Sequence, residues 1–218
     1  MRGIVARKIV AKVAHALVDY ALPPRCPACA AVTGEMHRFC AGCWQRLDFL
    51  PVEDARVRAA VAYGPVARDV LLKLKYARRL GHAEPVAAAM RRLMPAGAEL
   101  IVPVPLARGR LWSRGYNQAA LIAGALGRGA GVPFRHELLV RTRATPVLRG
   151  LGPGERRWAV AGAFAVRDAT AIAGRHVVLV DDVFTTGATS EGCVAVLERA
   201  GARVTTLVFA RVIAGEDD

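Results

Sequence analysis

The sequence predicts an α/β fold with a parallel sheet, preceded by a small cysteine-containing module. Two short apolar runs, residues 100–105 and 177–180, are each followed by a polar segment and then by helical spacing of apolar residues. Strands that alternate with helices in this way are typical of parallel sheets. The third observation is a pair of Cys-x-x-Cys sequences near the N-terminus. The 218 residues allow one medium-sized domain beside this module.

Residues 1–22 are predicted to form an amphipathic helix that Pro23 and Pro24 end. Lys8 and Lys12 interrupt the apolar run that a signal peptide would need. No stretch reaches the roughly 18 apolar residues that a membrane span requires. We therefore expect a cytoplasmic protein without a transmembrane segment. Its first helix packs on the main body or docks on a membrane surface or a partner.

Residues 23–50 are predicted to form a zinc ribbon. Cys26 and Cys29 form one Cys-x-x-Cys pair, and Cys40 and Cys43 form the second. In a cytoplasmic protein this spacing favours metal over disulfides. Four thiolates are the usual closed ligand set of a structural Zn²⁺, which would supply the stability that so short a module lacks. A redox pair or an iron–sulfur cluster is the alternative.

Residues 51–218 are predicted to form the α/β domain. It begins with a strand at residues 56–63 and continues with helices at 66–76 and about 85–94. Basic residues gather after the first of these helices. They form either a solvated helix face or a contact to phosphate or DNA, and they are Lys73, Arg78 and Arg79.

The strand at residues 100–105 is followed by a basic loop and then by a helix through Leu126. Ligands of open α/β sheets bind at the carboxyl ends of the strands. Arg114 is therefore the best candidate for contact with a phosphorylated ligand, because its planar guanidinium can bind two phosphate oxygens at once. Asn117 and Gln118 either cap the helix or touch the ligand.

Residues 141–164 show little periodicity and contain several glycines and five arginines. A basic loop broken by glycine can act as a lid that closes over a bound ligand. An ordinary exposed loop is the alternative interpretation.

Residues 177–189 form the organising motif of the domain. A buried strand is followed by Asp181 and Asp182, by a loop with three threonines and Gly187, and by a helix. A helix start offers unpaired N–H groups and partial positive charge to a phosphate. The two carboxylates can accept hydrogen bonds from ribose hydroxyls. A strand at residues 203–212 is expected to pair beside this one.

This motif resembles the phosphoribosyl-pyrophosphate (PRPP) motif of type I phosphoribosyltransferases. The resemblance implies that Asp181 and Asp182 hold the ribose hydroxyls, directly or through Mg²⁺, and that Arg114 faces the pyrophosphate. A receiver-type domain with an acidic magnesium site is the alternative, but such domains lack the threonine loop. The residues that would wrap the 5′-phosphate are Val183, Thr185, Thr186, Gly187, Ala188 and Thr189.

The chain carries 31 basic and 18 acidic residues, a net charge of +13. Such a balance favours polyanions: phosphates, nucleic acid or anionic membranes. Almost all the basic residues are arginine, and alanine is abundant, which nucleotide bias of the genome can also produce. Charge alone is therefore modest support for a DNA partner.

The order of these features, from the cysteine pairs through VPVPLARGRLWSRGYNQA to the PRPP motif, resembles the ComF family. That resemblance implies a double zinc ribbon fused to a phosphoribosyltransferase-like domain, and a link to natural transformation and DNA uptake. Family members commonly have glutamine at the position of Leu148 and asparagine at that of Ala159. Both departures lie in the lid, so they bear on catalysis more than on ligand binding.

Three functions remain open at this point. The first is an active phosphoribosyltransferase, in which a nitrogen nucleophile displaces pyrophosphate at the ribose anomeric carbon. The second is a nucleic-acid-processing accessory that binds single-stranded DNA and whose former PRPP pocket binds DNA ends or senses nucleotide. The third is a zinc-ribbon protein that docks DNA-processing proteins and has little chemistry of its own.

Overall fold

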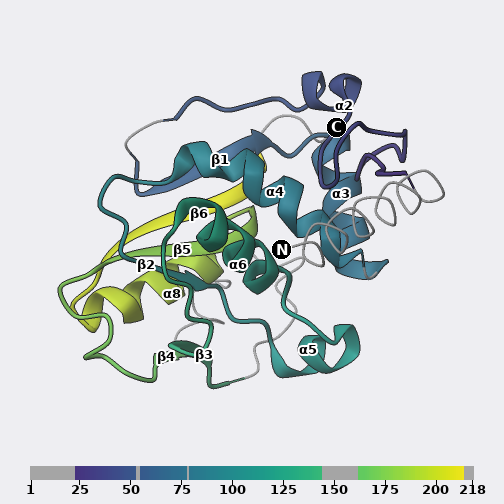
Figure 1. The fold of residues 1–218 in the computed structure, drawn as a ribbon. Coiled ribbons are helices and arrows are strands. Elements are labelled where there is room, and N and C mark those ends of the chain that lie inside the picture. The colour runs from purple at the N-terminus through teal and green to yellow at the C-terminus, as the bar shows by residue number, and fades with distance from the viewer. Residues whose placement is uncertain (1–22, 53–54, 78, 144–161, 214–218) are drawn as a thin grey trace, which may run out of the picture. The chain divides into compact units, whose positions relative to one another are not determined.

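A four-stranded parallel sheet forms the centre of the larger of two compact units, residues 47–218. In this computed structural model, which describes residues 23–52, 55–77, 79–143 and 162–213, the strand order is β1-β6-β5-β2 (Figure 1). Every neighbouring pair in this sheet is parallel, which confirms the predicted fold class. The strands are β1 (Val57–Ala62), β2 (Leu100–Pro103), β5 (His176–Phe184) and β6 (Arg203–Arg211).

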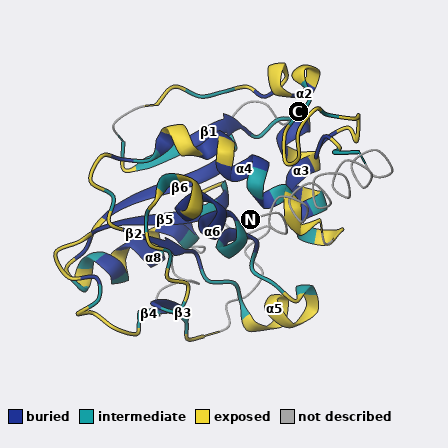
Figure 2. Cartoon of the chain, viewed as in Figure 1, coloured by how far each residue is buried: buried dark blue, intermediate teal, exposed yellow. Residues whose placement is uncertain are grey.

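Helices cover both faces of this sheet, and the strands between them are buried (Figure 2). Leu100 and Val102 of β2 belong to the same core cluster as residues of α8 (Ala188–Arg199). Ile101, which points to the opposite face, reaches Gly127 of α6 (Gln118–Ala130). Burial on both faces explains why these strands are continuous apolar runs without alternation.

The first helices of the unit follow the prediction closely. α3 (Pro65–Tyr76) starts at a proline, which suits the first helical position, and buries one apolar face. A short 3₁₀ turn, η1 (Leu80–His82), precedes α4 (Ala83–Met90). We expected α4 to continue to Met94, but its end tightens into a second 3₁₀ turn, η2 (Arg91–Leu93). Met94 itself is extended, as the residue before a proline tends to be.

Within the described residues of the larger unit, one α-helix was not predicted. The segment expected to be a basic loop contains α5 (Arg108–Arg114), which ends at Gly115 in the left-handed conformation. No residue of α5 is buried, as its colour in Figure 2 shows. Without a buried face there is no apolar period to reveal such a helix.

A separate antiparallel pair, β3 (Leu139–Arg141) and β4 (Phe164–Val166), brings together the two ends of the predicted lid. The Thr142 N–H also donates to the Ala163 carbonyl at 2.9 Å. The interior of the lid, including Leu148 and Ala159, lies outside the described residues.

The smaller unit is residues 1–46. Its described part contains the cysteine pairs, an isolated bridge between Arg25 and Val32, and the short helix α2 (Ala41–Gln45). The predicted N-terminal helix lies outside the described residues. Nothing among the helices that the structure describes is long and apolar enough to cross a membrane.

Candidate functional site

The acidic pair lies near the end of β5. We expected the strand to end at Val180, but it continues to Phe184 because its pairing with β6 continues. On the other side β2 stops pairing at Val180, so Asp181 and Asp182 lie beyond it. The Asp181 carboxylate accepts the N–H of Asp182 at 2.8 Å. Both acidic side chains line one open cavity at this point.

This cavity has a volume of about 500 Å³ and is referred to below as the acidic-pair cavity. Its walls come from five regions that are far apart in the sequence: the end of α3, the turn after β2, α5 with the start of α6, β3, and the β5–α8 segment. The lining residues are Lys75, Tyr76, Val104, Pro105, Leu106, Arg110, Arg114, Asn117, Gln118, Ala119, Arg141, Asp181, Asp182 and Thr189.

Three arginines line the cavity together with the acidic pair. Arg114 lies over the ring of Tyr76, 5.4 Å from its centre, and donates a hydrogen bond to Gln118. Arg141 lies over Phe164, and burial followed by repulsion from Arg110 lowers the pKa of its guanidinium. An anion between these arginines would relieve that repulsion. The sequence placed Arg110 and Arg114 in the basic segment expected to face the ligand and singled out Arg114, whereas Arg141 was expected only as part of the lid.

Lys75 is the residue that sequence reasoning missed. Its ammonium nitrogen lies 2.6 Å from Oδ2 of Asp182, across a sequence separation that spacing cannot reveal. Burial lowers the pKa of Lys75, but the carboxylates of Asp182 and Asp181 outweigh it, so the net pKa is raised. The pair is well shielded from water, with side-chain exposures of 22% for Lys75 and 7% for Asp182.

The surroundings of the Asp181 carboxyl group disfavour its charged form. Burial raises its pKa well above the usual value, and the neighbouring Asp182 carboxylate raises it further. The Asp182 N–H and Lys75 oppose this shift only in part. Hydrogen-bond donors from a ligand would stabilise the charged form.

The threonine loop forms a smaller cavity of about 70 Å³ at the start of α8. No side chain caps this helix, so its first N–H groups face the loop. Gly187 has φ +78°, and a Cβ there would lie 2.5 Å from Cζ of Phe184. A side chain there would strain the left-handed backbone and displace the Phe184 ring. Asp181 and Thr189 line both this cavity and the acidic-pair cavity, and the remaining lining residues are Val183, Phe184, Thr185, Thr186, Gly187, Ala188 and Ser190.

The contacts at the start of α6 give Asn117 the capping role, while Asn117 and Gln118 both line the acidic-pair cavity. Asn117 is the N-cap: its side chain accepts from the Ala119 N–H and donates to the Val104 carbonyl. Tyr116 donates from its hydroxyl to the Leu74 carbonyl at the end of α3. These bonds join two walls of the acidic-pair cavity. Of the basic cluster near α3, Arg78 lies outside the described residues.

The four predicted zinc ligands converge in the smaller unit. The sulfurs of Cys26, Cys29, Cys40 and Cys43 all lie within 4.8 Å of one another. A tetrahedral Zn²⁺ with Zn–S bonds of about 2.3 Å places its sulfurs roughly 3.8 Å apart, so the cluster fits this ion with small adjustments. Four protein ligands complete the tetrahedron, and such a site is structural.

The electrostatics of this cluster also suit a cation. Burial raises the pKa of Cys26, but backbone N–H groups, first that of Cys29, outweigh it and bring the pKa to about 6. Burial raises the pKa of Cys43 to about 12, although Arg46 donates to its sulfur. A metal ion would allow all four thiols to ionise together. Cys193 on α8 takes no part: it is fully buried, and burial raises its pKa, as expected for an inert thiol.

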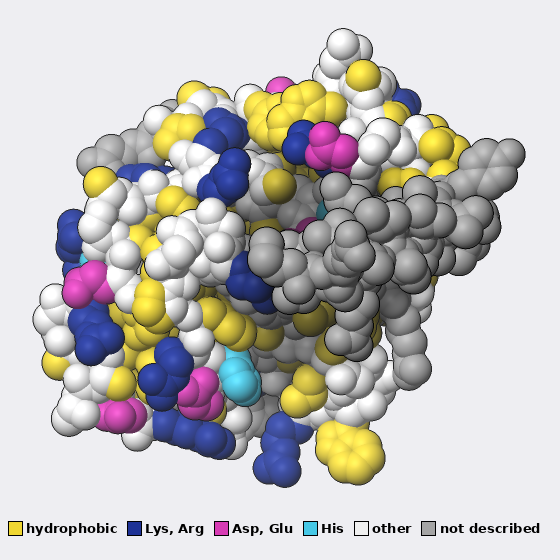
Figure 3. Space-filling view, viewed as in Figure 1, with side chains coloured by type: hydrophobic (Ala, Val, Ile, Leu, Met, Phe, Trp, Pro, Cys, Tyr) yellow, Lys and Arg dark blue, Asp and Glu magenta, His cyan; other side chains and the backbone are white. Residues whose placement is uncertain are grey.

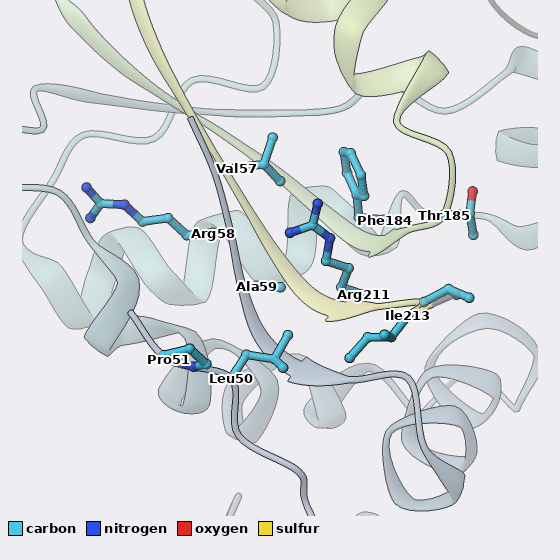
Figure 4. A pocket seen from close by; sticks show the side chains of 10 residues that line it. Leu50, Pro51, Val57, Arg58, Ala59, Phe184, Thr185, Arg211 and Ile213 are labelled. Atoms are coloured by element: carbon cyan, nitrogen blue, oxygen red, sulfur yellow. The ribbon is translucent and has the colours of Figure 1, made fainter. Parts of the chain in front are cut away.

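A third cavity, of about 420 Å³, lies at the β1 side of the sheet (Figure 4). Arg58 and Arg211 are its charged residues, and the Arg211 guanidinium lies over the ring of Phe184 at 5.2 Å. The remaining lining is mostly apolar. This cavity contains neither acidic residue of the PRPP-like motif, and we assign it no ligand.

Comparisons with known proteins agree with this arrangement. Residues 17–56 match the family model of the double zinc ribbon domain. The chain is 32% identical over 189 residues to the DNA utilization protein YhgH of Escherichia coli, covering 81% of this chain and 79% of that protein. It is 41% identical over 92 residues to competence protein F of Haemophilus influenzae, covering 42% of this chain and 40% of that protein. The chain belongs to the ComF family.

A more distant ComF relative and a solved structure complete the comparison. Competence protein ComFC of Bacillus subtilis is 27% identical over 173 residues, covering 75% of this chain and 67% of that protein. The crystal structure of adenine phosphoribosyltransferase from Leishmania donovani aligns with 16% identity and a TM-score of 0.43, covering 73% of each chain.

Proposed function

We propose that the acidic-pair cavity and the adjoining loop cavity together bind PRPP or a related phosphorylated ribose. One observation carries the proposal: the two cavities share Asp181 and Thr189, so a phosphate pocket, a pair of hydroxyl acceptors and a cluster of cations are continuous. A phosphorylated sugar with a second phosphate group presents these three features in the same order.

Different residues bind different parts of this ligand. Amides at the start of α8 and the hydroxyls of Thr185, Thr186 and Thr189 bind the 5′-phosphate. Asp181 and Asp182 accept hydrogen bonds from the ribose hydroxyls. The pyrophosphate is neutralised by the three cavity arginines, Arg110, Arg114 and Arg141.

In a phosphoribosyl transfer, these residues would hold the anomeric carbon near an incoming nitrogen and stabilise the departing pyrophosphate. Mg²⁺ prefers oxygen ligands, which the two carboxylates supply, and when bound it would neutralise part of the pyrophosphate charge. The Lys75 ammonium is already paired with one of these carboxylates, that of Asp182. The acidic pair therefore offers an incomplete ligand set for a protein-bound Mg²⁺.

Calorimetric titration with PRPP, followed by a pyrophosphate-release assay across candidate bases, tests this proposal. Asp182→Asn should weaken PRPP binding about tenfold, because a hydrogen bond to a charged acceptor contributes about 1.5–3 kcal/mol and asparagine offers only a neutral one. Asp69→Asn, an exposed acidic residue of α3 outside the cavity, is the matched control. Equal PRPP affinity in the wild type and the Asp182 variant would refute the assignment.

A second function, binding of single-stranded DNA, is supported by α5. This helix presents an indole that is 87% exposed, Trp112, beside Arg108 and Arg110. Figure 3 shows hydrophobic and basic side chains projecting together where Figure 1 places α5. Aromatic rings among basic side chains are typical of surfaces that stack bases and bind phosphates. The names of the relatives, a DNA utilization protein and two competence proteins, agree with a role in DNA uptake.

Fluorescence anisotropy with a labelled oligonucleotide tests this second function. Trp112→Ala should weaken binding about tenfold, since stacking on one aromatic contributes about 1–3 kcal/mol per base. Charge reversal at Arg108 should lower the salt dependence of the affinity. Arg199→Glu, on the exposed side of α8, is the control. Binding that survives both α5 changes would exclude this helix as the contact surface.

A further inference from the structure

The ion pair between Lys75 and Asp182 lies inside the acidic-pair cavity. The ammonium nitrogen is 2.6 Å from Oδ2 of Asp182, and Lys75 and both acidic residues line the cavity wall. Asp181 and Asp182 are adjacent, and the N–H of Asp182 is held by the Asp181 carboxylate. Lys75 therefore contacts Asp182 directly, and the charge of the neighbouring Asp181 acts on it through space.

The surrounding elements fix the position of Lys75. It lies in the last turn of α3, where the carbonyl end of the helix favours a positive charge. The Tyr116 hydroxyl donates to the carbonyl of the preceding residue, Leu74, and so ties the end of α3 to the start of α6. Tyr76, the next residue, lies under the Arg114 guanidinium. The lysine is thus held from both neighbouring positions in the chain.

Two adjacent carboxylates, of which Asp182 is buried and Asp181 half-buried, favour a compensating cation. A hard divalent ion is the usual solution, because carboxylate oxygens are its preferred ligands. Here the described part of the cavity supplies a lysine from another element at hydrogen-bond distance. An ammonium has three N–H donors, so it can contact ligand oxygens while it stays paired with Asp182.

We propose that the Lys75 ammonium takes the place of a divalent cation at the Asp181–Asp182 pair, so that the phosphoribosyl ligand binds with little dependence on Mg²⁺. Lys75 is then a positioning residue: it orients Asp182 toward the ribose hydroxyls and leaves its remaining N–H donors for ligand oxygens. The role in ligand binding rests on the proposed function, whereas the replacement of a divalent cation does not.

The replacement of a divalent cation is tested without any ligand, by titrating zinc-loaded protein with Mn²⁺ and following free Mn²⁺ by electron paramagnetic resonance. The wild type should bind no Mn²⁺ at millimolar concentrations. Lys75→Met should gain one Mn²⁺ site, because both carboxylates become available. The double variant Lys75→Met/Asp182→Asn should lose that site again. It also avoids the buried, uncompensated Asp182 carboxylate that Lys75→Met alone leaves behind. Lys73→Met, on the same helix but outside the cavity, is the control.

Two results would overturn this role of Lys75: tight Mn²⁺ binding by the wild type that Asp182→Asn abolishes, or no gain of Mn²⁺ binding in a folded Lys75→Met variant. If Lys75→Met does not fold, Lys75→Gln provides the same comparison. A gain of the site in the Lys73→Met control would also refute it.

The role in ligand binding is tested by measuring PRPP affinity with Mg²⁺ and in buffer freed of Mg²⁺ over a chelating resin, since soluble chelators would remove zinc. The wild type should lose less than about fivefold in affinity without Mg²⁺, and Lys75→Met should lose more than about tenfold. Lys75→Arg should restore most of the Mg²⁺-independent binding. Equal Mg²⁺ dependence in the wild type and Lys75→Met refutes the inference. No PRPP binding by the wild type under either condition refutes the proposed function, and the Mn²⁺ titration then decides the role of Lys75.

Discussion

The cysteine cluster and the acidic-pair cavity are built in opposite ways. All four sulfurs come from residues 26–43, and two tight Cys-x-x-Cys turns bring them together. The cavity draws its side chains from five regions between Lys75 and Thr189. The first site depends on local geometry and a metal ion, whereas the second depends on the packing of the whole sheet. Perturbations of the two sites should therefore have different consequences.

The largest expected effect is at the cysteine cluster. Cys43→Ala removes a ligand from a site whose metal contributes on the order of 10 kcal/mol to folding in small zinc modules. Zinc content, measured by plasma mass spectrometry, should fall from about one per chain to almost none. The circular dichroism spectrum of the chain should change little, because residues 47–218 form the larger unit and have their own core.

Cys193→Ala is the matched control, since this cysteine lies on α8 and outside the cluster. It should keep a full complement of zinc. Retention of zinc by Cys43→Ala would contradict the assignment of Cys43 as a ligand, and loss of the main fold together with the metal would contradict the independence of the two sites.

The same difference explains what the sequence could predict. The four cysteines of the site could be predicted from the sequence because their local spacing alone identifies them. The buried strands could also be predicted, because strands that are buried on both faces are continuous apolar runs such as Val177–Val180. Asp181 and Asp182 were expected after the strand, since aspartate is rare in strands, but pairing with β6 extends β5 through them.

The parts that could not be predicted are those that depend on distant contacts. Lys75 is one of several basic residues on α3 in the sequence, and only the fold brings it to Asp182. Arg141 belongs to the predicted lid, yet its side chain lines the cavity. Helix α5 buries nothing, so it has no apolar pattern. Local spacing predicts a phosphate-binding loop, but it does not predict which cations surround that loop.

The second-largest effect is expected at the turn before α8. Gly187→Ala combines a left-handed backbone, φ +78°, with a Cβ that would lie 2.5 Å from the Phe184 ring. We expect a loss of about 2–3 kcal/mol in the free energy of unfolding, measured by denaturant titration, with zinc content unchanged.

Gly174→Ala separates the two causes. This glycine has φ +74°, but a Cβ added there would meet no atom within 4 Å, so only backbone strain remains, about 1 kcal/mol. Adding Phe184→Leu to Gly187→Ala should recover the difference. Equal losses for the two alanine variants would show that the contact with Phe184 is unimportant.

Asp181→Asn should have a smaller effect, and it should raise the free energy of unfolding instead of lowering it. Burial and the Asp182 carboxylate raise the pKa of Asp181 in the folded protein, so the unfolded chain loses this proton at lower pH. The free energy of unfolding of the wild type should therefore fall as pH rises from about 4 through the folded-state pKa. Asparagine does not titrate and should stabilise the ligand-free protein at pH 7 by on the order of 1 kcal/mol.

This gain should disappear below about pH 4, where the aspartic acid is protonated in both states. Denaturant titrations of both proteins from pH 4 to 8 measure the difference. The variant should also bind PRPP more weakly, because a hydroxyl acceptor is lost. A stability difference that does not change with pH would rule out the electrostatic explanation.

The smallest effect concerns a single contact that assembles the cavity. Tyr116→Phe removes the hydrogen bond to the Leu74 carbonyl, which joins the start of α6 to the end of α3. The loss should be about 1 kcal/mol in the free energy of unfolding. PRPP affinity should fall a few-fold as well, because Lys75 and Tyr76 follow Leu74 directly and line the cavity. Zinc content should be unaffected. If stability falls while PRPP affinity stays the same, the cavity does not depend on this link between distant elements, and the contrast with the locally built cysteine site becomes weaker.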